Sequence, residues 1–97
     1  MVNPRTNLES KAMYYIYILK SKNDNNLYIG STKNLGRRIG EHNGGLVFST
    51  KSRIPFKLIY YEAYKSERDA RNREKNLKIR SRAFSQLKKR IRESLFL

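Results

Sequence analysis

The feature that most constrains this fold is a dense run of strand-forming residues near the start of the chain. Residues 14–19 read YYIYIL and contain no charged residue, glycine or proline. Aromatic and β-branched residues favour an extended strand, and an apolar run without alternation is typical of a strand covered on both faces. The chain has 97 residues, enough for one domain with a modest core. We therefore expect one small domain whose core includes this strand.

A turn and a second short strand follow this run. The sequence NDNN at 23–26 is a turn cluster and LYIG at 27–30 is strand-like, so the two strands are predicted to form a hairpin. Because side chains alternate along a strand, Tyr17 and Tyr28 share a face if the loop holds an even number of residues. A two-residue loop would place the tyrosines directly opposite each other, whereas a bulge would break the relation.

A helix is predicted after the hairpin. Asn34 is a typical N-cap residue and NGG at 43–45 is a typical helix end, so the helix spans about 34–43. Leu35 and Ile39 mark its buried side by their spacing.

Two polar residues share the buried side of that helix. Arg38 is three residues from Leu35, and His42 is four residues beyond Arg38, so both are expected to point inward. Arg37 and Glu41 lie on the outer side as an ordinary i,i+4 ion pair. Arg38 is therefore the unusual arginine of the two, and Arg37 the routine one.

The second half of the chain predicts one strand and two helices. A loop at 46–55 leads to the strand FKLIYYEAY at 56–64, and Ser66 then opens a helix with Asp69 completing its cap. A last amphipathic helix is expected over about 84–95. Its inward residues are Phe84, Leu87, Ile91 and Leu95, and its outward residues are Lys88, Lys89, Arg90 and Arg92. The predicted element order is β-β-α-β-α-α, an α+β fold.

Composition excludes several classes of protein. The chain has no cysteine, which rules out a disulfide framework and a thiolate metal site. No apolar run approaches the roughly 20 residues needed to span a bilayer, and the first residues lack the apolar stretch of a signal peptide. We expect residues 1–12 to be a flexible tail before a single domain over 13–97. We also expect a soluble, cytoplasmic protein with no membrane partner.

Charge points to a polyanionic partner. The 22 Lys and Arg residues face 8 Asp and Glu residues, which gives a net charge of +14. Such an excess is typical of proteins that contact nucleic acid, and contacts to phosphates make binding depend strongly on salt. A solvated surface or a ribosome-bound protein with structural charge is the alternative. The cations are concentrated in residues 65–92.

Glu74 is the acid most in need of an explanation. It falls on the apolar stripe of its helix, four residues after Ala70 and three before Leu77. A carboxylate on such a stripe is costly unless it pairs with a cation. One interpretation is a buried ion pair with Arg38. The other is a ligand for Mg²⁺, which binds oxygen and accepts a single carboxylate with several waters. The sequence holds no acidic cluster of the kind that a two-metal nuclease needs.

The other inward polar residues also have two interpretations. Arg38 either binds a phosphate oxygen and offsets transition-state charge, or lies against strand backbone. His42 either orients or deprotonates a tyrosine or water, or is a satisfied core residue. Tyr17 and Tyr28 are either ordinary strand aromatics or bases, and the latter requires cations such as Arg38, a metal and Lys33 to lower a tyrosine pKa.

Taken in order, these residues resemble the GIY-YIG nuclease superfamily. Residues 15–17 (YIY) stand where the family has GIY, and residues 28–30 are a literal YIG. Residues 35–42 (LGRRIGEH) look like the arginine helix, and 73–75 (REK) look like the segment with the metal-binding glutamate. The resemblance extends over about 13–92. It is nearest to the small, single-domain endonucleases that are excinuclease-subunit-C-like, or URI-domain, proteins.

The resemblance implies a fold and a chemistry. The fold is a small three-stranded antiparallel sheet flanked by helices, and the reaction is single-metal hydrolysis of a DNA strand with Mg²⁺ or Mn²⁺. By resemblance Glu74 is the metal ligand, Arg38 stabilises charge and His42 supports the site. A motif tyrosine, Tyr17 or Tyr28, helps to generate the nucleophile.

Further cations are expected to hold the nucleic acid. The candidates are Lys33, Arg37, Lys51, Arg53, Lys78 and Arg80. Two departures from the family pattern stand out. Tyr15 replaces the first glycine of GIY, and the family's late asparagine has no firm counterpart, Asn76 being one candidate.

The sequence therefore predicts a Mg²⁺-dependent DNA endonuclease that acts in DNA repair or processing. Single-stranded, branched and damaged DNA are all candidate substrates, and RNA stays open, as does the oligomeric state. The alternative is a non-catalytic nucleic-acid-binding module of the same fold, although a pure binder has no need of an inward glutamate.

Overall fold

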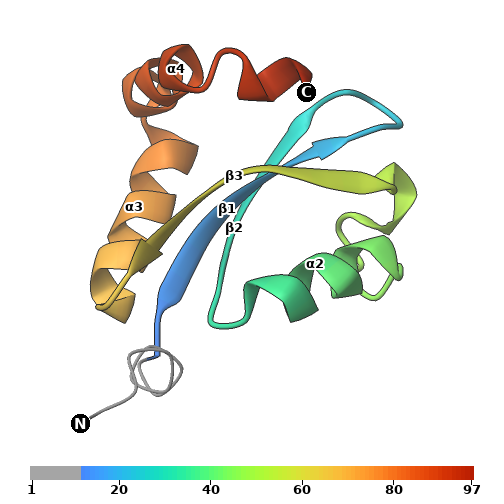
Figure 1. The fold of residues 1–97 in the computed structure, drawn as a ribbon, viewed down its shortest axis with the longest axis horizontal. Coiled ribbons are helices and arrows are strands. Elements are labelled where there is room, and N and C mark those ends of the chain that lie inside the picture. The colour runs from blue at the N-terminus through green and yellow to red at the C-terminus, as the bar shows by residue number, and fades with distance from the viewer. Residues whose placement is uncertain (1–11) are drawn as a thin grey trace, which may run out of the picture.

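Three strands form one antiparallel sheet in the computed structural model, which describes residues 12–97 (Figure 1). They are β1 (Tyr14–Ser21), β2 (Leu27–Thr32) and β3 (Phe56–Tyr64), and β1 lies between the other two. The apolar run is thus the central strand, with Ile16 through Leu19 buried, as its lack of alternation predicts. Apart from Ala12, the predicted tail lies outside the described residues.

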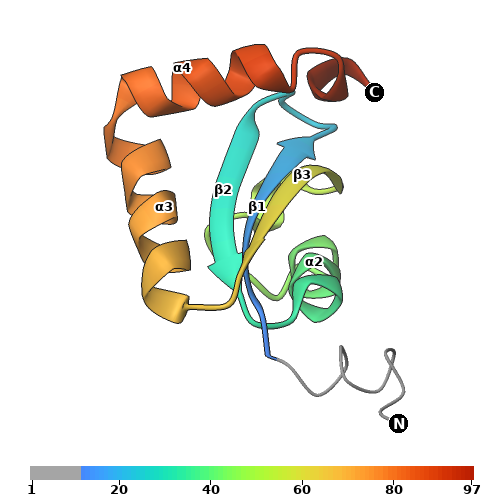
Figure 2. The ribbon, with the colours of Figure 1, turned by 60° about the vertical axis from the view of Figure 1, so that its left-hand side comes forward.

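Helices cover both faces of the sheet, as Figures 1 and 2 show. On one face α2 (Leu35–Asn43) places Leu35 and Ile39 in a cluster with Tyr17, Leu19, Tyr28 and Phe56. On the other face α3 (Glu67–Ile79) and α4 (Ser81–Arg90) enclose a second cluster. Its buried members are Ile16, Ile18, Ala70, Leu77, Leu87 and Ile91. Alternate residues of β1 therefore belong to opposite cores.

The hairpin between β1 and β2 places the two motif tyrosines on one face. The Ser21 amide donates to the Asn26 carbonyl at 3.0 Å, which closes a loop of residues 22–25. This even-numbered loop confirms the predicted condition. In the register Tyr17 pairs with Gly30 and Leu19 with Tyr28, so the tyrosines are diagonal neighbours, with ring centroids 6.3 Å apart.

The α+β fold and the order β-β-α-β-α-α are confirmed, but the predicted last helix is wrong at both ends. Instead of spanning 84–95, α4 begins directly after α3 and ends at Arg90, and a turn leads to a short 3-10 helix at Ser94–Phe96. Leu95 still packs against the core, and its carbonyl accepts a hydrogen bond from Lys20 Nζ at 2.7 Å. Periodicity missed the break because the turn returns Leu95 to the same face.

No helix within residues 12–97 is both long enough and apolar enough to cross a bilayer.

Candidate active site

Helix α2 is positioned by the cap that the sequence predicts. The side chain of Asn34 accepts a hydrogen bond from the Arg37 amide at 3.0 Å, and the Gly44 amide at the other end donates to the Gly40 carbonyl at 2.8 Å. Between these ends His42 is turned fully into the protein, with no exposed surface. The inward placement predicted for His42 is confirmed.

A continuous chain of polar contacts runs through His42. The Tyr17 hydroxyl lies 2.9 Å from His42 Nε2, and His42 Nδ1 lies 2.8 Å from the hydroxyl of buried Thr50. The Thr50 hydroxyl also donates to the Val47 carbonyl at 3.4 Å. Because the Thr50 hydroxyl donates its proton to the Val47 carbonyl, its oxygen is left to accept from His42 Nδ1–H. His42 Nε2 is then unprotonated and accepts from the Tyr17 hydroxyl. The histidine is then a proton acceptor aimed at the tyrosine.

Burial and a neighbouring charge favour the neutral form of His42. Burial lowers its pKa below the ordinary value of 6.5, and the positive charge of Arg38 lowers it further. A neutral imidazole is the form that can take a proton from the Tyr17 hydroxyl.

Tyr17 lies directly over the glycine of YIG. A Cβ atom at Gly30 would stand 2.4 Å from the Tyr17 hydroxyl oxygen, so any larger residue would displace the phenol. The Tyr28 ring packs on the other side of the site, with its centroid 4.9 Å from that of His42. The motif glycine therefore makes room for the motif tyrosine across the strand pair.

The surroundings of Tyr17 do not meet the condition, set out from the sequence, that neighbouring cations lower a tyrosine pKa for it to act as a base. Burial raises the pKa of Tyr17 to about 12, and the negative charge of Glu74 acts in the same direction. A hydrogen bond from Arg38 opposes this shift but does not overcome it. Tyr17 can therefore pass a proton on, but it is not a standing tyrosinate.

The two arginines of α2 differ in burial as predicted. The Arg38 side chain is 35% exposed and that of Arg37 is 65% exposed. Glu41 pairs with both, at 2.9 Å from Arg38 Nη1 and 3.6 Å from Arg37 Nε, whereas the sequence predicted only the second pair. Hydrogen bonds to Glu41 and Tyr17 raise the pKa of Arg38, so it carries a permanent charge beside the phenol.

Glu74 reaches the same region from the opposite face of the sheet. Its Oε1 accepts a hydrogen bond from the Ser31 hydroxyl and its Oε2 contacts Lys78 Nζ, each at 2.8 Å. Its side chain is 20% exposed. Within the described part of the chain Arg38 pairs with Glu41, so the buried Glu74–Arg38 pair left open by the sequence does not form.

The site therefore straddles the edge strand β2. Gly30 faces Tyr17 on the α2 side, and the next residue, Ser31, turns to Glu74 on the α3 side. The charge of Glu74 raises the pKa of Tyr17, so carboxylate and phenol interact across this strand. Sequence reasoning missed Ser31 and Thr50, although strand alternation next to YIG could have pointed to Ser31.

The donor atoms fit a single magnesium ion better than a metal cluster. Glu74 and Ser31 offer a carboxylate and a hydroxyl oxygen, which are donors that Mg²⁺ accepts alongside several waters. Residues 12–97 contain no group of three or more His, Asp and Glu side chains that could hold a metal together. Lys78 would have to release Glu74 for a cation to bind there.

The cations predicted to bind nucleic acid differ in exposure and in pairing. Lys33, Arg37, Lys51, Lys78 and Arg80 are exposed, although Arg37 also lies 3.6 Å from Glu41. Two of the six make closer ion pairs. Lys78 pairs with Glu74, and Arg53 Nε contacts Asp24 at 2.7 Å, which helps to lower the Asp24 pKa to about 2.

Arg53 has a structural role in the hairpin loop. Besides its ion pair it donates to the Leu27 carbonyl at 3.4 Å. Arg53 thus links the segment after α2 to the β1–β2 turn. Because its guanidinium is engaged in these contacts, it is less able to bind a phosphate than the exposed cations are.

Comparison with known proteins shows the family of this chain. The GIY-YIG catalytic domain family matches residues 13–92. The chain belongs to the GIY-YIG family. A UPF0213 protein of Clostridium perfringens is 46% identical over 67 residues, which cover 68% of this chain and 71% of that protein. A UPF0213 protein of Staphylococcus haemolyticus is 44% identical over 72 residues, covering 73% of this chain and 87% of the relative.

A solved structure supports the same grouping. The solution NMR structure of a UPF0213 protein from Bacillus halodurans is 35% identical to this chain, with a TM-score of 0.50. The match covers 77% of this chain and 81% of that protein. This is the small, single-domain branch of the GIY-YIG family that the motifs predict, and the family points to nuclease chemistry on nucleic acid.

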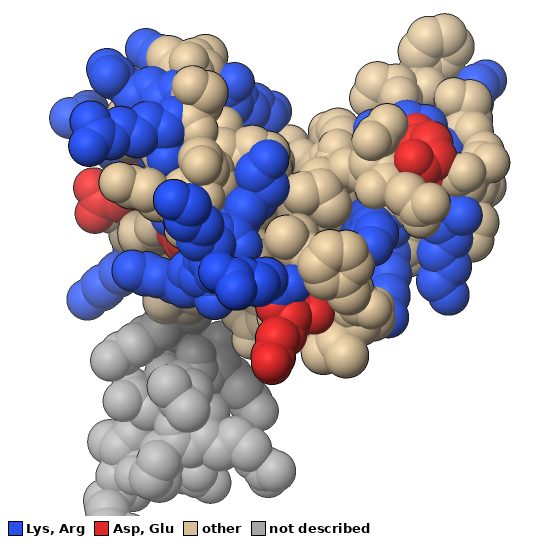
Figure 3. Space-filling view, turned by 90° about the horizontal axis from the view of Figure 1, so that it is seen from above, with Lys and Arg blue, Asp and Glu red and all other residues tan. Residues whose placement is uncertain are grey.

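The surface also suits a nucleic acid. Lys and Arg side chains gather on the side of the molecule that carries α3 and α4 (Figure 3). Exposed cations of this region are Arg80, Arg82, Lys88, Lys89, Arg90 and Arg92.

Proposed function

We propose that this GIY-YIG protein is a divalent-metal-dependent endonuclease that hydrolyses DNA phosphodiester bonds at the β2 edge. The observation that carries the proposal is the meeting of four kinds of group at one strand. They are a phenol hydrogen-bonded to a neutral imidazole, a permanent guanidinium charge, and a carboxylate whose partners within residues 12–97 are a hydroxyl and a half-exposed lysine. Together they match the needs of phosphodiester hydrolysis.

In this mechanism the side chains on the α2 face handle the proton and the charge. As a water oxygen attacks phosphorus, its proton passes to the Tyr17 hydroxyl while the Tyr17 proton moves to His42 Nε2. The bond from phosphorus to the leaving oxygen then breaks. Arg38 offsets the negative charge that builds on the non-bridging oxygens. Thr50 fixes the imidazole in the accepting tautomer.

Glu74 and Ser31 hold the divalent cation in this proposal. Bound there, Mg²⁺ or Mn²⁺ would act as a Lewis acid on the phosphate and its leaving oxygen. Tyr28 lines the site beside His42, and we assign the proton relay to Tyr17 because its hydroxyl makes the imidazole contact.

The exposed cations give the protein its hold on DNA without reading sequence. We propose that Lys33, Arg37, Lys51 and Arg80 contact phosphates, and that substrate choice follows DNA structure, with single-stranded, branched or damaged DNA as the candidates. The role is in DNA repair or processing. The relatives named above are bacterial, and in bacteria such substrates lie in the cytoplasm. Residues 13–97 act as one catalytic domain in this proposal.

The experiment is a cleavage assay with labelled single-stranded, duplex and forked oligonucleotides, with RNA included, in Mg²⁺ or Mn²⁺. Glu74→Ala should lower the cleavage rate by about a thousandfold or more, because it removes the carboxylate proposed to hold the metal, while DNA binding stays equal or becomes slightly tighter. Equal cleavage by parent and variant would reject the proposal. It would favour the alternative of a non-catalytic nucleic-acid-binding module.

A further inference from the structure

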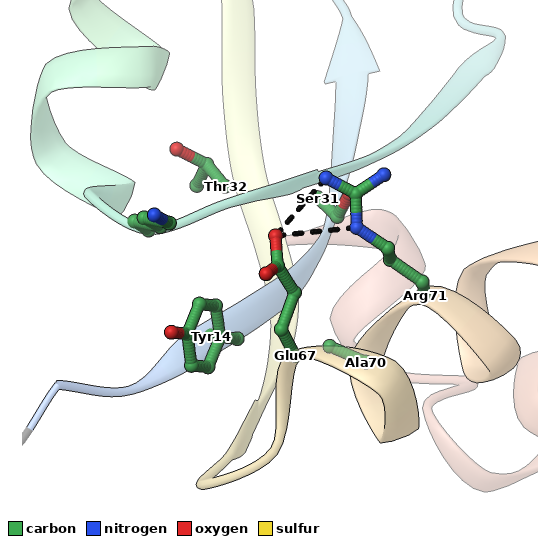
Figure 4. Close-up of a pocket in the computed structure, with 7 residues that line it drawn as sticks. Tyr14, Ser31, Thr32, Glu67, Ala70 and Arg71 are labelled. Carbon is green, nitrogen blue, oxygen red and sulfur yellow. Dashed lines mark hydrogen bonds and ion pairs between the residues drawn. The ribbon is translucent and has the colours of Figure 1, made fainter.

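A small cleft opens between the end of β2 and the first turns of α3 (Figure 4). Its volume is about 140 Å³. Its lining residues are Tyr14, Ser31, Thr32, Lys33, Glu67, Ala70 and Arg71. None of these residues belongs to the proton relay described above.

The cleft is continuous with the proposed metal site. Ser31 lines the cleft and also donates its hydroxyl proton to Glu74. Ala70, on the cleft wall, lies four residues before Glu74 on the same face of α3, which is a rise of about 6 Å along the helix axis. Successive phosphates of a DNA strand advance about 3.4 Å along the duplex axis and lie farther apart through space. A phosphate at Glu74 would therefore place its neighbour at the cleft.

Two cations of the cleft can receive that neighbour. Lys33 is exposed at the end of β2, with Nζ 5.8 Å from the centroid of the Tyr14 ring. The Arg71 side chain is 71% exposed on α3. They approach from opposite walls, one from the sheet and one from the helix.

One of these cations, Arg71, already forms an ion pair with an acid of the same chain, Glu67. Glu67 points from the start of α3 toward β2, and Figure 4 shows its carboxylate bridged to Arg71. The contacts to Glu67 Oε2 are 3.2 Å from Arg71 Nε and 3.0 Å from Arg71 Nη2. A carboxylate held by both nitrogens of a guanidinium fork is an arrangement that a phosphate oxygen also adopts. The pair is exposed, so separating it costs little.

We propose that this cleft binds the backbone phosphate next to the scissile one, and that Glu67 is an internal stand-in that this phosphate displaces from Arg71. This inference rests on the proposed nuclease function, because only a nuclease has a scissile phosphate. Lys33 and Arg71 hold the incoming phosphate. When no phosphate enters the cleft, Glu67 stays paired with Arg71, so Arg71 does not contribute to the binding of other polyanions. The cleft thereby fixes the register of the strand over Glu74.

The first test is DNA binding without cleavage. Fluorescence anisotropy with a labelled single-stranded oligonucleotide in EDTA compares Glu67→Gln with the control Glu93→Gln, which removes the same charge from an exposed residue outside the cleft. Glu67→Gln should tighten binding by about three- to tenfold, and Glu93→Gln by less than twofold. In an Arg71→Ala background the gain from Glu67→Gln should disappear. Arg71→Ala alone should lower the slope of log affinity against log salt by about 0.7.

The second test locates the phosphate. One neutral methylphosphonate linkage is placed beside the cleaved bond, and kcat/KM is measured for the parent and for Arg71→Ala. The neutral linkage should slow the parent severalfold and have no further effect on Arg71→Ala, because both changes remove the same contact.

The outcomes separate the two proposals. If the protein cleaves DNA but Glu67→Gln and Glu93→Gln change affinity equally, Glu67–Arg71 is an ordinary surface ion pair and the cleft proposal is overturned. If the Glu67 effect on binding is found but no oligonucleotide is cleaved, the nuclease assignment fails and phosphate binding by the cleft stands.

Discussion

The carboxylates of Glu62 and Glu74 are buried to a similar extent, yet they differ in the groups that surround them. The Glu62 side chain on β3 is 16% exposed and that of Glu74 is 20% exposed. Arg73 donates from Nε and Nη2 to Glu62, each at 3.0 Å, and the Tyr60 hydroxyl donates at 2.6 Å. The Tyr64 hydroxyl is a further donor. Among the described residues, Glu74 is contacted by one hydroxyl, that of Ser31, and by one half-exposed lysine, Lys78.

The difference separates a structural acid from an available one. Burial raises the pKa of Glu62, but Arg73 and the two tyrosines outweigh it, so the net shift is downward and the carboxylate stays charged and saturated. Glu74 keeps room for a cation. Inward position alone therefore does not single out a candidate metal ligand; the unfilled capacity of its oxygens is the further criterion that favours Glu74 over Glu62.

The same contrast applies to buried Tyr17 and half-buried Tyr60, whose pKa values are both raised to about 12. Tyr17→Phe should lower the cleavage rate by roughly 10²–10⁴-fold, because it removes the proton relay to His42. Tyr60→Phe should leave the rate per folded molecule unchanged. Single-turnover cleavage measures both. A Tyr28→Phe variant that is slower than Tyr17→Phe would transfer the relay to Tyr28.

The two arginines of α2 give the next largest effect. Arg38→Ala should lower kcat by about 10²–10³-fold, because its charge faces the transition state. Arg37→Ala should chiefly raise KM by a few-fold and reduce the salt dependence of binding, because it is an exposed phosphate contact. Steady-state kinetics at two salt concentrations separate the effects. A larger kcat loss for Arg37→Ala would show that the roles are reversed.

Glu62→Gln should act on stability instead of chemistry. It leaves Arg73 partly buried without its counter-charge, which should lower the free energy of unfolding by about 2–3 kcal/mol. Urea denaturation measures this, with Glu93→Gln as the matched control at an exposed site. A loss below about 0.5 kcal/mol would mean that the Glu62 network is not structural.

The smallest expected effect is a pH dependence of stability from His42. Its folded pKa lies below the unfolded value of 6.5, so the unfolded chain takes up the proton first as pH falls. Melting temperature should therefore decline as pH drops below about 6.5 and level off below the folded pKa. His42→Asn should flatten this part of the curve. Cleavage should also decline on the acid side, where His42 can no longer accept a proton.

Much of the fold was predictable because its signals are local. The apolar run of β1, the cap at Asn34 and the spacing of Leu35 and Ile39 each follow from a few neighbouring residues. The end of α4 was not predictable, because the turn after Arg90 depends on how the C-terminal residues return to the core.

The candidate site was predictable only in part. Helical spacing indicated Arg38 and His42, and the structure brings them to Tyr17. The raised pKa of Tyr17 was not predictable from spacing, because burial is a property of the assembled core. The Glu62 network joins residues 2 to 11 positions apart in the chain, through a contact between β3 and α3 that no local pattern reports.

The most direct test is single-turnover cleavage by Glu74→Gln and Glu62→Gln side by side, in saturating Mg²⁺ and at a temperature where circular dichroism shows both to be folded. The account predicts that Glu62→Gln cleaves at close to the parent rate while Glu74→Gln is inactive. Cleavage by Glu74→Gln together with loss of activity in Glu62→Gln would contradict it.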